Sequence, residues 1–264
     1  MSVIYDRVAL IGLGLIAGSM ALAMKRGKLA TEIVGTARSA ETRAVAAEIG
    51  LCDRVVETAA EAARDADGVV LAVPVGGMGA VAGEIAPTVT DACSLKRHVI
   101  EAVAPHIPEG VHFIPGHPLA GTEHSGPRSG FASLFENRWC LMIADDATDA
   151  EALARLSGLW QAMGANVETM DADHHDLAVA VTSHAPHLIA YTMVGVADDM
   201  QRVTDDEVIK YSAGGFRDFT RIAASDPTMW RDVFLTNRDA TLEILGRFTA
   251  EPFALQRAIR TGDG

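Results

Sequence analysis

Two arginines four residues apart, Arg217 and Arg221, are the clearest indication of chemistry in the sequence. If the segment is an α-helix, this spacing places both guanidinium groups on one face. A guanidinium group is always charged and binds a carboxylate through two parallel hydrogen bonds, so the pair suits a small substrate with two negative groups. The alternative is a solvated helix face on which both arginines form ion pairs with Asp218 or Asp226.

A histidine that could move a proton stands in Gly116-His117-Pro118, after an apolar run of strand length at residues 111–114. We expect His117 to lie in a loop at the carboxyl end of a sheet, where open α/β sheets place their ligands. Because the ordinary pKa of histidine is about 6.5, this side chain can accept a proton near neutral pH. Taken alone, a loop histidine is more often an ordinary polar residue.

Two further histidines, His184 and His187, are three residues apart, about one helical turn, and could be metal ligands. His174, His175 and Asp176 lie upstream. No cysteine, carboxylate and histidine set with zinc spacing completes a site, so the sequence predicts no metal.

A glycine-rich turn near the start of the sequence has the pattern of a dinucleotide site. Gly12-x-Gly14-x-x-Ala17 closes an apolar run of strand length and opens an alanine- and leucine-rich helical stretch. The first glycine permits the tight bend, the second lets the backbone approach pyrophosphate, and the small third residue allows close packing. The helix N-terminus then binds the anion. The predicted cofactor-binding residues here are Gly12, Gly14, Leu15, Ile16 and Ala17.

The end of the second predicted strand indicates which cofactor is used. An enzyme selective for NAD normally has an acid there, which binds the ribose hydroxyls. This chain has Ala37, followed by Arg38 and Ser39, which offer a charged fork and a hydroxyl to a 2′-phosphate. We predict NADP as the favoured cofactor and NAD as the alternative, since Arg38 could instead stack on adenine. Val73 and Pro74, at the end of a later strand, are predicted to border the nicotinamide, although an ordinary turn would have the same sequence pattern.

The elements that must hold these residues are indicated by apolar runs separated by alanine-rich helical stretches. Strands that alternate with helices are typical of a parallel sheet covered on both faces. After Met170 the strand signal stops and only helical periodicity follows. The sequence therefore predicts an α/β fold: a Rossmann-type doubly wound parallel sheet over residues 1–171, then an all-α domain over residues 172–264. The predicted strands span residues 7–12, 32–35, 68–73, 89–91, 112–114, 140–144 and 166–169.

Four segments in this order resemble the prephenate and arogenate (cyclohexadienyl) dehydrogenases, the family that makes the aromatic ring of tyrosine. They are residues 12–19, 116–126, 183–187 and 214–232, and the last reads Gly-Gly-Phe-Arg-Asp-Phe-Thr-Arg-Ile-Ala-Ala-Ser-Asp-Pro-Thr-Met-Trp-Arg-Asp. The resemblance spans nearly the whole chain. It implies NAD(P)-dependent oxidative decarboxylation of prephenate, arogenate or both, and a helical C-terminal domain that pairs two chains as a homodimer.

The resemblance also implies roles for individual residues. His117 would polarise the ring hydroxyl while hydride leaves the same carbon, and Ser94 would hold histidine and hydroxyl in register. The sequence alone also allows Ser94 to be a helix N-cap. Arg221 is the first choice for a carboxylate clamp and Arg217 the second. The other substrate-binding residues that the resemblance implies are His187 at the substrate side chain, Glu123 at the substrate mouth, and Trp230 as an aromatic wall or else as core.

One departure from the family is the short connection between Gly77 and Asp91, which passes through residues 85–90. A crossover between parallel strands needs at least about 10 to 12 residues including its helix, so the connection is feasible but tight.

Composition limits the classes of function. The chain has 264 residues, a net charge of −13, 49% hydrophobic and 22% charged residues, which is typical of a globular protein of one large or two smaller domains. The negative charge and the lack of a basic cluster argue against nucleic acid as a partner.

No apolar run approaches the roughly 20 residues that cross a bilayer and no signal sequence is visible, so we predict a cytoplasmic protein without a membrane partner. Three scattered cysteines predict free thiols.

Two other functions stay open. Another two-domain reductase, of the β-hydroxyacid dehydrogenase kind, would need a lysine acid on the helix after the sheet, and no segment there matches. A dinucleotide-sensing regulator without turnover is disfavoured because His117, Ser94 and Arg221 are all present.

Overall fold

A computed structural model describes residues 2–82, 88–122, 124–204 and 208–262 of the chain. The chain divides into two compact units, Met1–His175 and Asp176–Gly264. Residues 85–87 of the short connection predicted to be tight lie outside the described residues.

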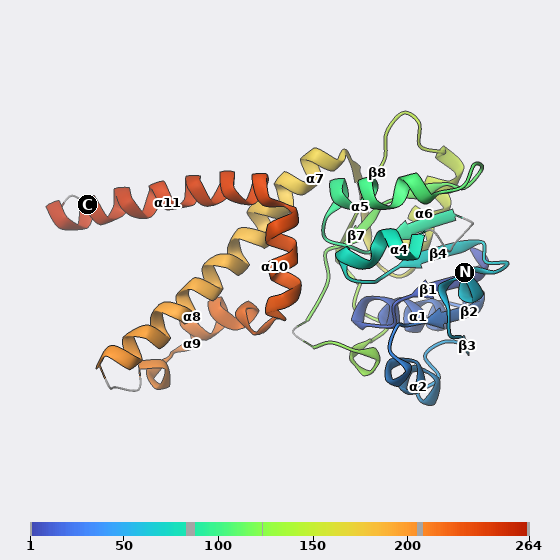
Figure 1. Cartoon of the computed structure of the whole chain (residues 1–264), viewed down its shortest axis with the longest axis horizontal. Coiled ribbons are helices and arrows are strands. Elements are labelled where there is room, and N and C mark those ends of the chain that lie inside the picture. The colour runs from blue at the N-terminus through green and yellow to red at the C-terminus, as the bar shows by residue number, and fades with distance from the viewer. Residues whose placement is uncertain (1, 83–87, 123, 205–207, 263–264) are drawn as a thin grey trace. The chain divides into compact units, whose positions relative to one another are not determined.

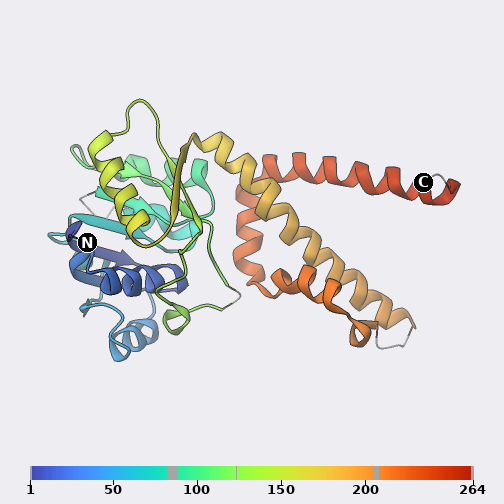
Figure 2. The same cartoon turned by 180° about the vertical axis from the view of Figure 1, so that it is seen from behind.

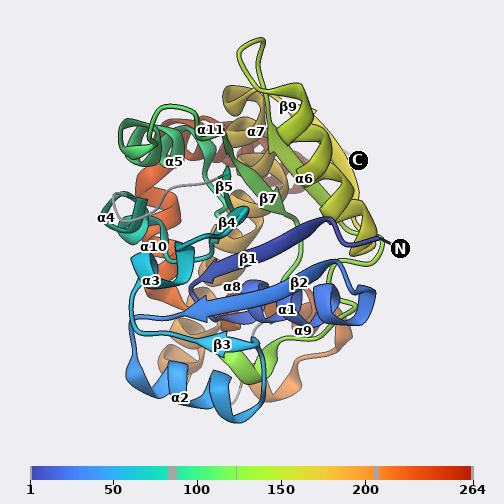
Figure 3. The same ribbon diagram turned by 90° about the vertical axis from the view of Figure 1, so that its right-hand side faces the viewer.

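The first unit is built on a six-stranded sheet whose neighbouring strands are all parallel. The strand order β3-β2-β1-β4-β5-β6 means that the chain starts in the middle, builds one half and then returns to build the other (Figure 3). This confirms the predicted Rossmann-type sheet. The strands are β1 Tyr5–Ile11, β2 Ala30–Thr36, β3 Arg54–Val55, β4 Gly68–Leu71, β5 Thr88–Asp91 and β6 Phe113–Ile114.

Three helices of the first unit begin at a residue whose side chain caps them. Ser39, Thr58 and Asp149 each accept a hydrogen bond from a backbone N–H of the first turn that follows them. Short 3₁₀ turns, such as η1 Val75–Gly77, complete the connections. The helices are α1 Leu15–Gly27, α2 Ala40–Glu48, α3 Ala59–Ala63, α4 Met78–Ala82, α5 Lys96–Val103 and α6 Ala150–Ala162.

A second, three-stranded sheet in this unit differs from the prediction, which placed every strand in one parallel sheet. β7 Gly116–Pro118 pairs antiparallel with β8 Trp139–Ile143, and β8 pairs parallel with β9 Asn166–Met170. His117 therefore lies in a strand, opposite Leu141, and the predicted loop position is wrong. The physical reason is that Gly-His-Pro has no apolar run of its own and becomes a strand only by pairing with a segment more than twenty residues away.

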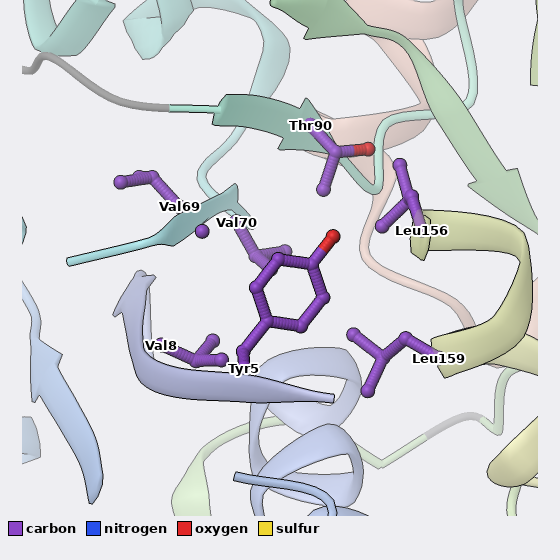
Figure 4. Close-up of a pocket in the computed structure, with 8 residues that line it drawn as sticks. Tyr5, Val8, Val69, Val70, Thr90, Leu156 and Leu159 are labelled. Carbon is purple, nitrogen blue, oxygen red and sulfur yellow. The ribbon is translucent and has the colours of Figure 1, made fainter. Parts of the chain in front are cut away.

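The core of the first unit is formed by the parallel sheet together with α1 and α6. Figure 4 shows the Tyr5 ring enclosed by valines of the sheet and by Leu156 and Leu159 of α6. Burial raises the pKa of Tyr5 to about 12. The guanidinium carbon of Arg155 lies 4.1 Å from the centre of the same ring, so the edge of this core is closed by a cation–π contact.

Helices are the only regular elements among the described residues of the second unit, as predicted. α7 Ala172–Val179 carries the chain into it and passes through a π-helical turn, Ala180–His184, into α8 Ala185–Thr204. Figures 1 and 2 show that α11 runs away from the other helices of its unit along most of its length. The remaining elements are η5 Val208–Tyr211, α9 Gly214–Thr220, η6 Arg221–Ala224, α10 Pro227–Thr236 and α11 Arg238–Thr261.

One helical run of the chain is apolar enough on average to be a candidate membrane span. The continuous helical run Ala172–Met200 has 29 residues and a window of mean hydropathy 1.2, so its length and composition match those of a helix that could cross a membrane. Polar residues such as His184 interrupt the run, so it contains no unbroken apolar stretch of bilayer length, whereas a window average tolerates them. Core helices of soluble proteins meet the same criterion, so this run alone assigns no membrane.

Candidate active site

His117 is held by a second histidine. Its side chain is 8% exposed, and its Nδ1 lies 2.9 Å from Nε2 of His175, which is fully buried. The two rings meet edge to face with centroids 5.1 Å apart. In sequence reasoning His175 was considered only as a possible metal ligand. The pairing was missed because the two residues are 58 positions apart.

A buried ion pair adjoins the same strand. Lys96 Nζ lies 2.6 Å from Asp91 Oδ2 and 2.6 Å from the Gly116 carbonyl oxygen, and both charged side chains are completely buried. The Gly116 N–H donates to Asp91 Oδ1 at 3.2 Å. Neither Asp91 nor Lys96 was predicted to be part of the site, although both flank Ser94 in the sequence.

Ser94 is half-buried in the turn between β5 and α5. The alternative that it is a helix N-cap is wrong, because α5 begins at Lys96 with Leu95 as its N-cap and no side-chain capping bond. The Ser94 hydroxyl is therefore not used to start the helix.

The glycine turn has the geometry that a bound dinucleotide requires. Gly12 has φ of +99°, and a Cβ there would lie 2.4 Å from the Ala72 carbonyl oxygen, so only glycine fits. Gly14 is the N-cap of α1, and a Cβ at Gly14 would meet nothing within 4 Å, which leaves the helix N-terminus approachable by a phosphate. Ala17 is completely buried, Leu15 is 9% exposed and Ile16 is half-buried.

A loop from the second sheet packs against α1. A Cβ at Gly130 would lie 2.8 Å from the Gly18 carbonyl carbon, so the two backbones are in direct contact. The Phe131 N–H donates to the buried Ser19 hydroxyl at 3.1 Å. The close packing predicted for residues 17 and 18 thus involves this loop as well as the sheet.

The β2–α2 loop is shaped by an arginine that sequence reasoning did not single out. Arg43 Nη1 donates to the carbonyl oxygens of Ala37 and Arg38, at 2.6 and 3.0 Å. Ser39 caps α2 by accepting from Thr42 N at 3.3 Å. The side chains of Arg38 and Ser39 are both exposed at the end of β2.

These parts of the first unit meet at the carboxyl ends of the parallel strands. Ile11, Leu71 and Asp91 are aligned across β1, β4 and β5, so the glycine turn and the segments that contain Val73 and Ser94 leave the sheet side by side. Val73 is half-buried, and its Cγ1 would lie 3.1 Å from a Cβ at Gly12. Pro74 is exposed and is the N-cap of η1.

In the second unit, His187 and Trp230 form a stacked pair with centroids 3.6 Å apart and planes 21° apart. Trp230 is 7% exposed, so one face of its indole is covered by His187. His187 Nδ1 lies 2.8 Å from the Ser183 carbonyl oxygen, to which it donates. Burial lowers the pKa of His187 and the nearby charge of Arg221 lowers it further, while the hydrogen bond to Ser183 opposes them. His187 is therefore neutral at pH 7, with its proton on Nδ1.

The arginine pair is exposed, but it does not lie in one α-helix as the spacing suggested. α9 ends at Thr220, and Arg221 begins the 3₁₀ turn η6. Because a 3₁₀ helix turns more tightly than an α-helix, the spacing of four no longer guarantees a shared face. Asp226, a possible ion-pair partner, caps α10 through Met229 N at 2.8 Å. Glu123 lies outside the described residues.

The predicted site residues thus fall into two sets, one in each unit. Within the described residues, no group of three or more His, Cys, Asp or Glu side chains is arranged to bind a metal. All three cysteines are free thiols, as predicted.

Residues 20–169 match the family model for the prephenate dehydrogenase nucleotide-binding domain, and residues 171–264 match the model for the prephenate dehydrogenase dimerization domain. The chain belongs to the prephenate dehydrogenase family. This confirms the resemblance and makes the chain an oxidoreductase of the prephenate dehydrogenase type.

Individual prephenate dehydrogenase relatives are similar along the whole chain. A cyclohexadienyl dehydrogenase of Zymomonas mobilis is 38% identical over 99% of this chain and 91% of its own length. A prephenate dehydrogenase of Bacillus subtilis is 34% identical over 94% of this chain and 68% of its own. The solved structure of Aquifex aeolicus prephenate dehydrogenase with hydroxyphenyl propionate and NAD+ has a TM-score of 0.86 at 29% identity, over 99% of this chain and 92% of that one.

Proposed function

We propose that the chain catalyses the NAD(P)-dependent oxidative decarboxylation of prephenate, arogenate or both, giving 4-hydroxyphenylpyruvate or tyrosine in tyrosine biosynthesis. The observation that carries the proposal is the buried His117–His175 pair, joined through Gly116 to the sheet edge that bears the glycine turn. The names of the relatives support the same substrate class.

We assign the proton transfer to His117 Nε2, the ring nitrogen opposite the one bonded to His175. Ser94 would bind the same ring hydroxyl and keep it in line with His117. A bound nicotinamide supplies the hydride acceptor. Formation of the aromatic ring provides most of the driving force, so the protein need only position the substrate and place charge near its carboxylates.

The second unit would bind the rest of the substrate. Arg221 is the first carboxylate ligand and Arg217 the second, because guanidinium binds carboxylate in a planar fork. His187 would contact the substrate side chain, with Trp230 stacked behind it as support. Glu123 keeps its assignment at the substrate mouth.

We further propose that NADP is favoured over NAD. No acid ends β2 to repel a 2′-phosphate, and the exposed Arg38 and Ser39 follow Ala37 directly. Arg43 supports this assignment because it holds the backbone of the loop in place. Gly12, Gly14, Leu15, Ile16, Ala17, Val73 and Pro74 would form the rest of the cofactor site.

The cofactor proposal is tested by replacing Ala37 with aspartate. The ratio of kcat/KM for NADP to that for NAD should fall about tenfold or more, since the new carboxylate repels the phosphate and binds the ribose hydroxyls. Ala150→Asp, an equal change of charge at the exposed start of α6, is the control and should leave the ratio unchanged. A wild type that prefers NAD tenfold would contradict the proposal.

We also propose that the two domains have different functions. Residues 1–171 bind the dinucleotide, and residues 172–264 bind substrate and join two chains as a homodimer. The match to a dimerization domain supports the second part. We place the protein in the cytoplasm as a biosynthetic enzyme.

The overall proposal is tested by incubating the full chain with NADP or NAD and with prephenate or arogenate, and following absorbance at 340 nm. Turnover with either substrate is expected. Cofactor binding without turnover of either substrate would instead favour the sensing regulator, and kcat/KM for the two substrates side by side would define the preference.

A further inference from the structure

The buried ion pair of Asp91 and Lys96 is the strongest unexplained feature of the first unit. Both side chains are completely buried, and their charged atoms are 2.6 Å apart. Burying such a pair is a poor way to stabilise a fold, because the desolvation of two charges offsets most of their attraction. A hydrophobic pair of similar size would serve stability as well, so a second role is needed.

The hydrogen bonds of the pair indicate that role. Asp91 Oδ2 accepts from Cys93 N at 2.8 Å, and Cys93 directly precedes Ser94. Gly116 directly precedes His117 and is held on both sides, by Asp91 Oδ1 at its N–H and by Lys96 Nζ at its carbonyl oxygen. One ion pair therefore fixes the backbone immediately before each of the two proposed catalytic side chains.

The strand that the pair holds has little room to move. A Cβ at Gly116 would lie 3.2 Å from the Asp91 carbonyl oxygen and 3.3 Å from the Thr90 hydroxyl. β7 thus lies directly against the end of β5, and a shift in the ion pair would be passed to the backbone of Gly116 and from there to His117.

We propose that Asp91 and Lys96 are positioning residues, which set the relative placement of Ser94 and His117 for the reaction. The inference rests on the proposed function, because it takes these two residues as the reacting pair. Displacing a catalytic group by about 1 Å can lower the rate about 100-fold, so the pair would act on kcat while leaving the cofactor site intact.

A double replacement separates positioning from stability. Lys96→Met alone leaves the Asp91 charge buried without its counter-charge and should lower the melting temperature strongly. Asp91→Leu with Lys96→Met removes both charges and should recover part of that loss, because the N–H groups of Cys93 and Gly116 then lack their acceptor. The double variant should bind cofactor with a KM within about threefold of wild type and lose about 10- to 100-fold in kcat. The matched control is Arg26→Ala with Glu136→Ala, an exposed pair 2.7 Å apart in the same unit, which should change neither quantity.

Each outcome decides the matter. A folded double variant with kcat within about threefold of wild type would overturn the proposal. A double variant that fails to fold, or that loses cofactor binding together with kcat, would also overturn it, because the pair would then be structural. Absence of turnover by the wild type is a different result, since it would refute the proposed function itself.

Discussion

The two units of this chain differ in how firmly their candidate site residues are held by burial and hydrogen bonds. In the first, His117, Asp91 and Lys96 are buried; Asp91 and Lys96 bond the backbone of Gly116, and His117 bonds His175. In the second, Arg217 and Arg221 are exposed and His187 is half-buried. The apolar surface differs in the same sense: of the large hydrophobic side chains exposed among the described residues, four belong to the first unit and fifteen to the smaller second one.

This difference separates side chains that are held in one position from side chains that can change conformation. A group proposed to move a proton must be held closely, and in the first unit His117 is held by His175 and by the hydrogen bonds of its neighbour Gly116. Groups that bind carboxylates act through long, charged side chains and tolerate more freedom. The exposed apolar side chains of the second unit form the surface that the proposed homodimer would cover.

The largest effect is expected from His117→Asn in the first unit. We expect kcat to fall about 10² to 10⁴-fold with little change in KM, because the imidazole acts on the proton that moves in the transition state. Steady-state kinetics at saturating cofactor would measure both. His187→Asn is the matched change in the second unit, and a comparable loss of kcat there would break the distinction between the units.

Arg221→Ala should raise the KM for substrate about tenfold or more with a smaller change in kcat, since charge-assisted binding is felt in both the ground and transition states. Arg217→Ala should act in the same direction but less. If Arg221→Ala left kcat and KM unchanged, the solvated helix face would be the correct interpretation of the pair.

The apolar surface of the second unit is tested by charge on α11. Leu255 and Ile259 are 62% and 80% exposed, and replacing both with glutamate should convert a homodimer to a monomer, halving the mass measured by light scattering at micromolar concentration. Val3→Glu, at a residue 48% exposed in the first unit, is the control and should leave the dimer intact. A wild type that is already monomeric would contradict the proposed dimer.

The smallest effect is a dependence of stability on pH through His187. Its pKa in the folded state lies below the ordinary value of 6.5, so its contribution to stability is present above pH 6.5 and is lost as pH falls through the folded pKa. His187→Gln cannot be protonated, so its melting temperature should fall less than that of the wild type between about pH 7 and pH 5. Equal falls in both proteins would show that the environment of His187 does not favour the neutral ring.

The sequence predicted those parts of the fold that local patterns determine. β1, β2 and β4 were found because strands buried on both faces are continuous apolar runs, and the glycine turn because Gly12 must adopt positive φ. β7 was missed because its strand character depends on pairing with β8.

The sequence was sufficient to select candidate site residues, but not to predict the hydrogen bonds that hold them. His117 and Ser94 were selected from the family motif, whereas the partners that hold them were not. Neither Asp91 nor Lys96 is predicted as a site residue, because the backbone that both of them bond, at Gly116, lies 20 or more positions away in the sequence. Likewise the spacing of Arg217 and Arg221 could not reveal that the helix changes type at Thr220.

The contact between Gly130 and Gly18 has a consequence for how the first unit can be observed. The loop that follows β7 can dock only on a formed α1, and the Phe131 amide is bonded to Ser19 in that helix only when it has docked. Solvent hydrogen exchange at this one amide therefore records opening of the loop from the helix that begins at the glycine turn. The exchange rate of the Phe131 amide hydrogen thus reports whether the start of α1 is intact. It can be measured without turnover, at a residue far from the glycine turn in the sequence.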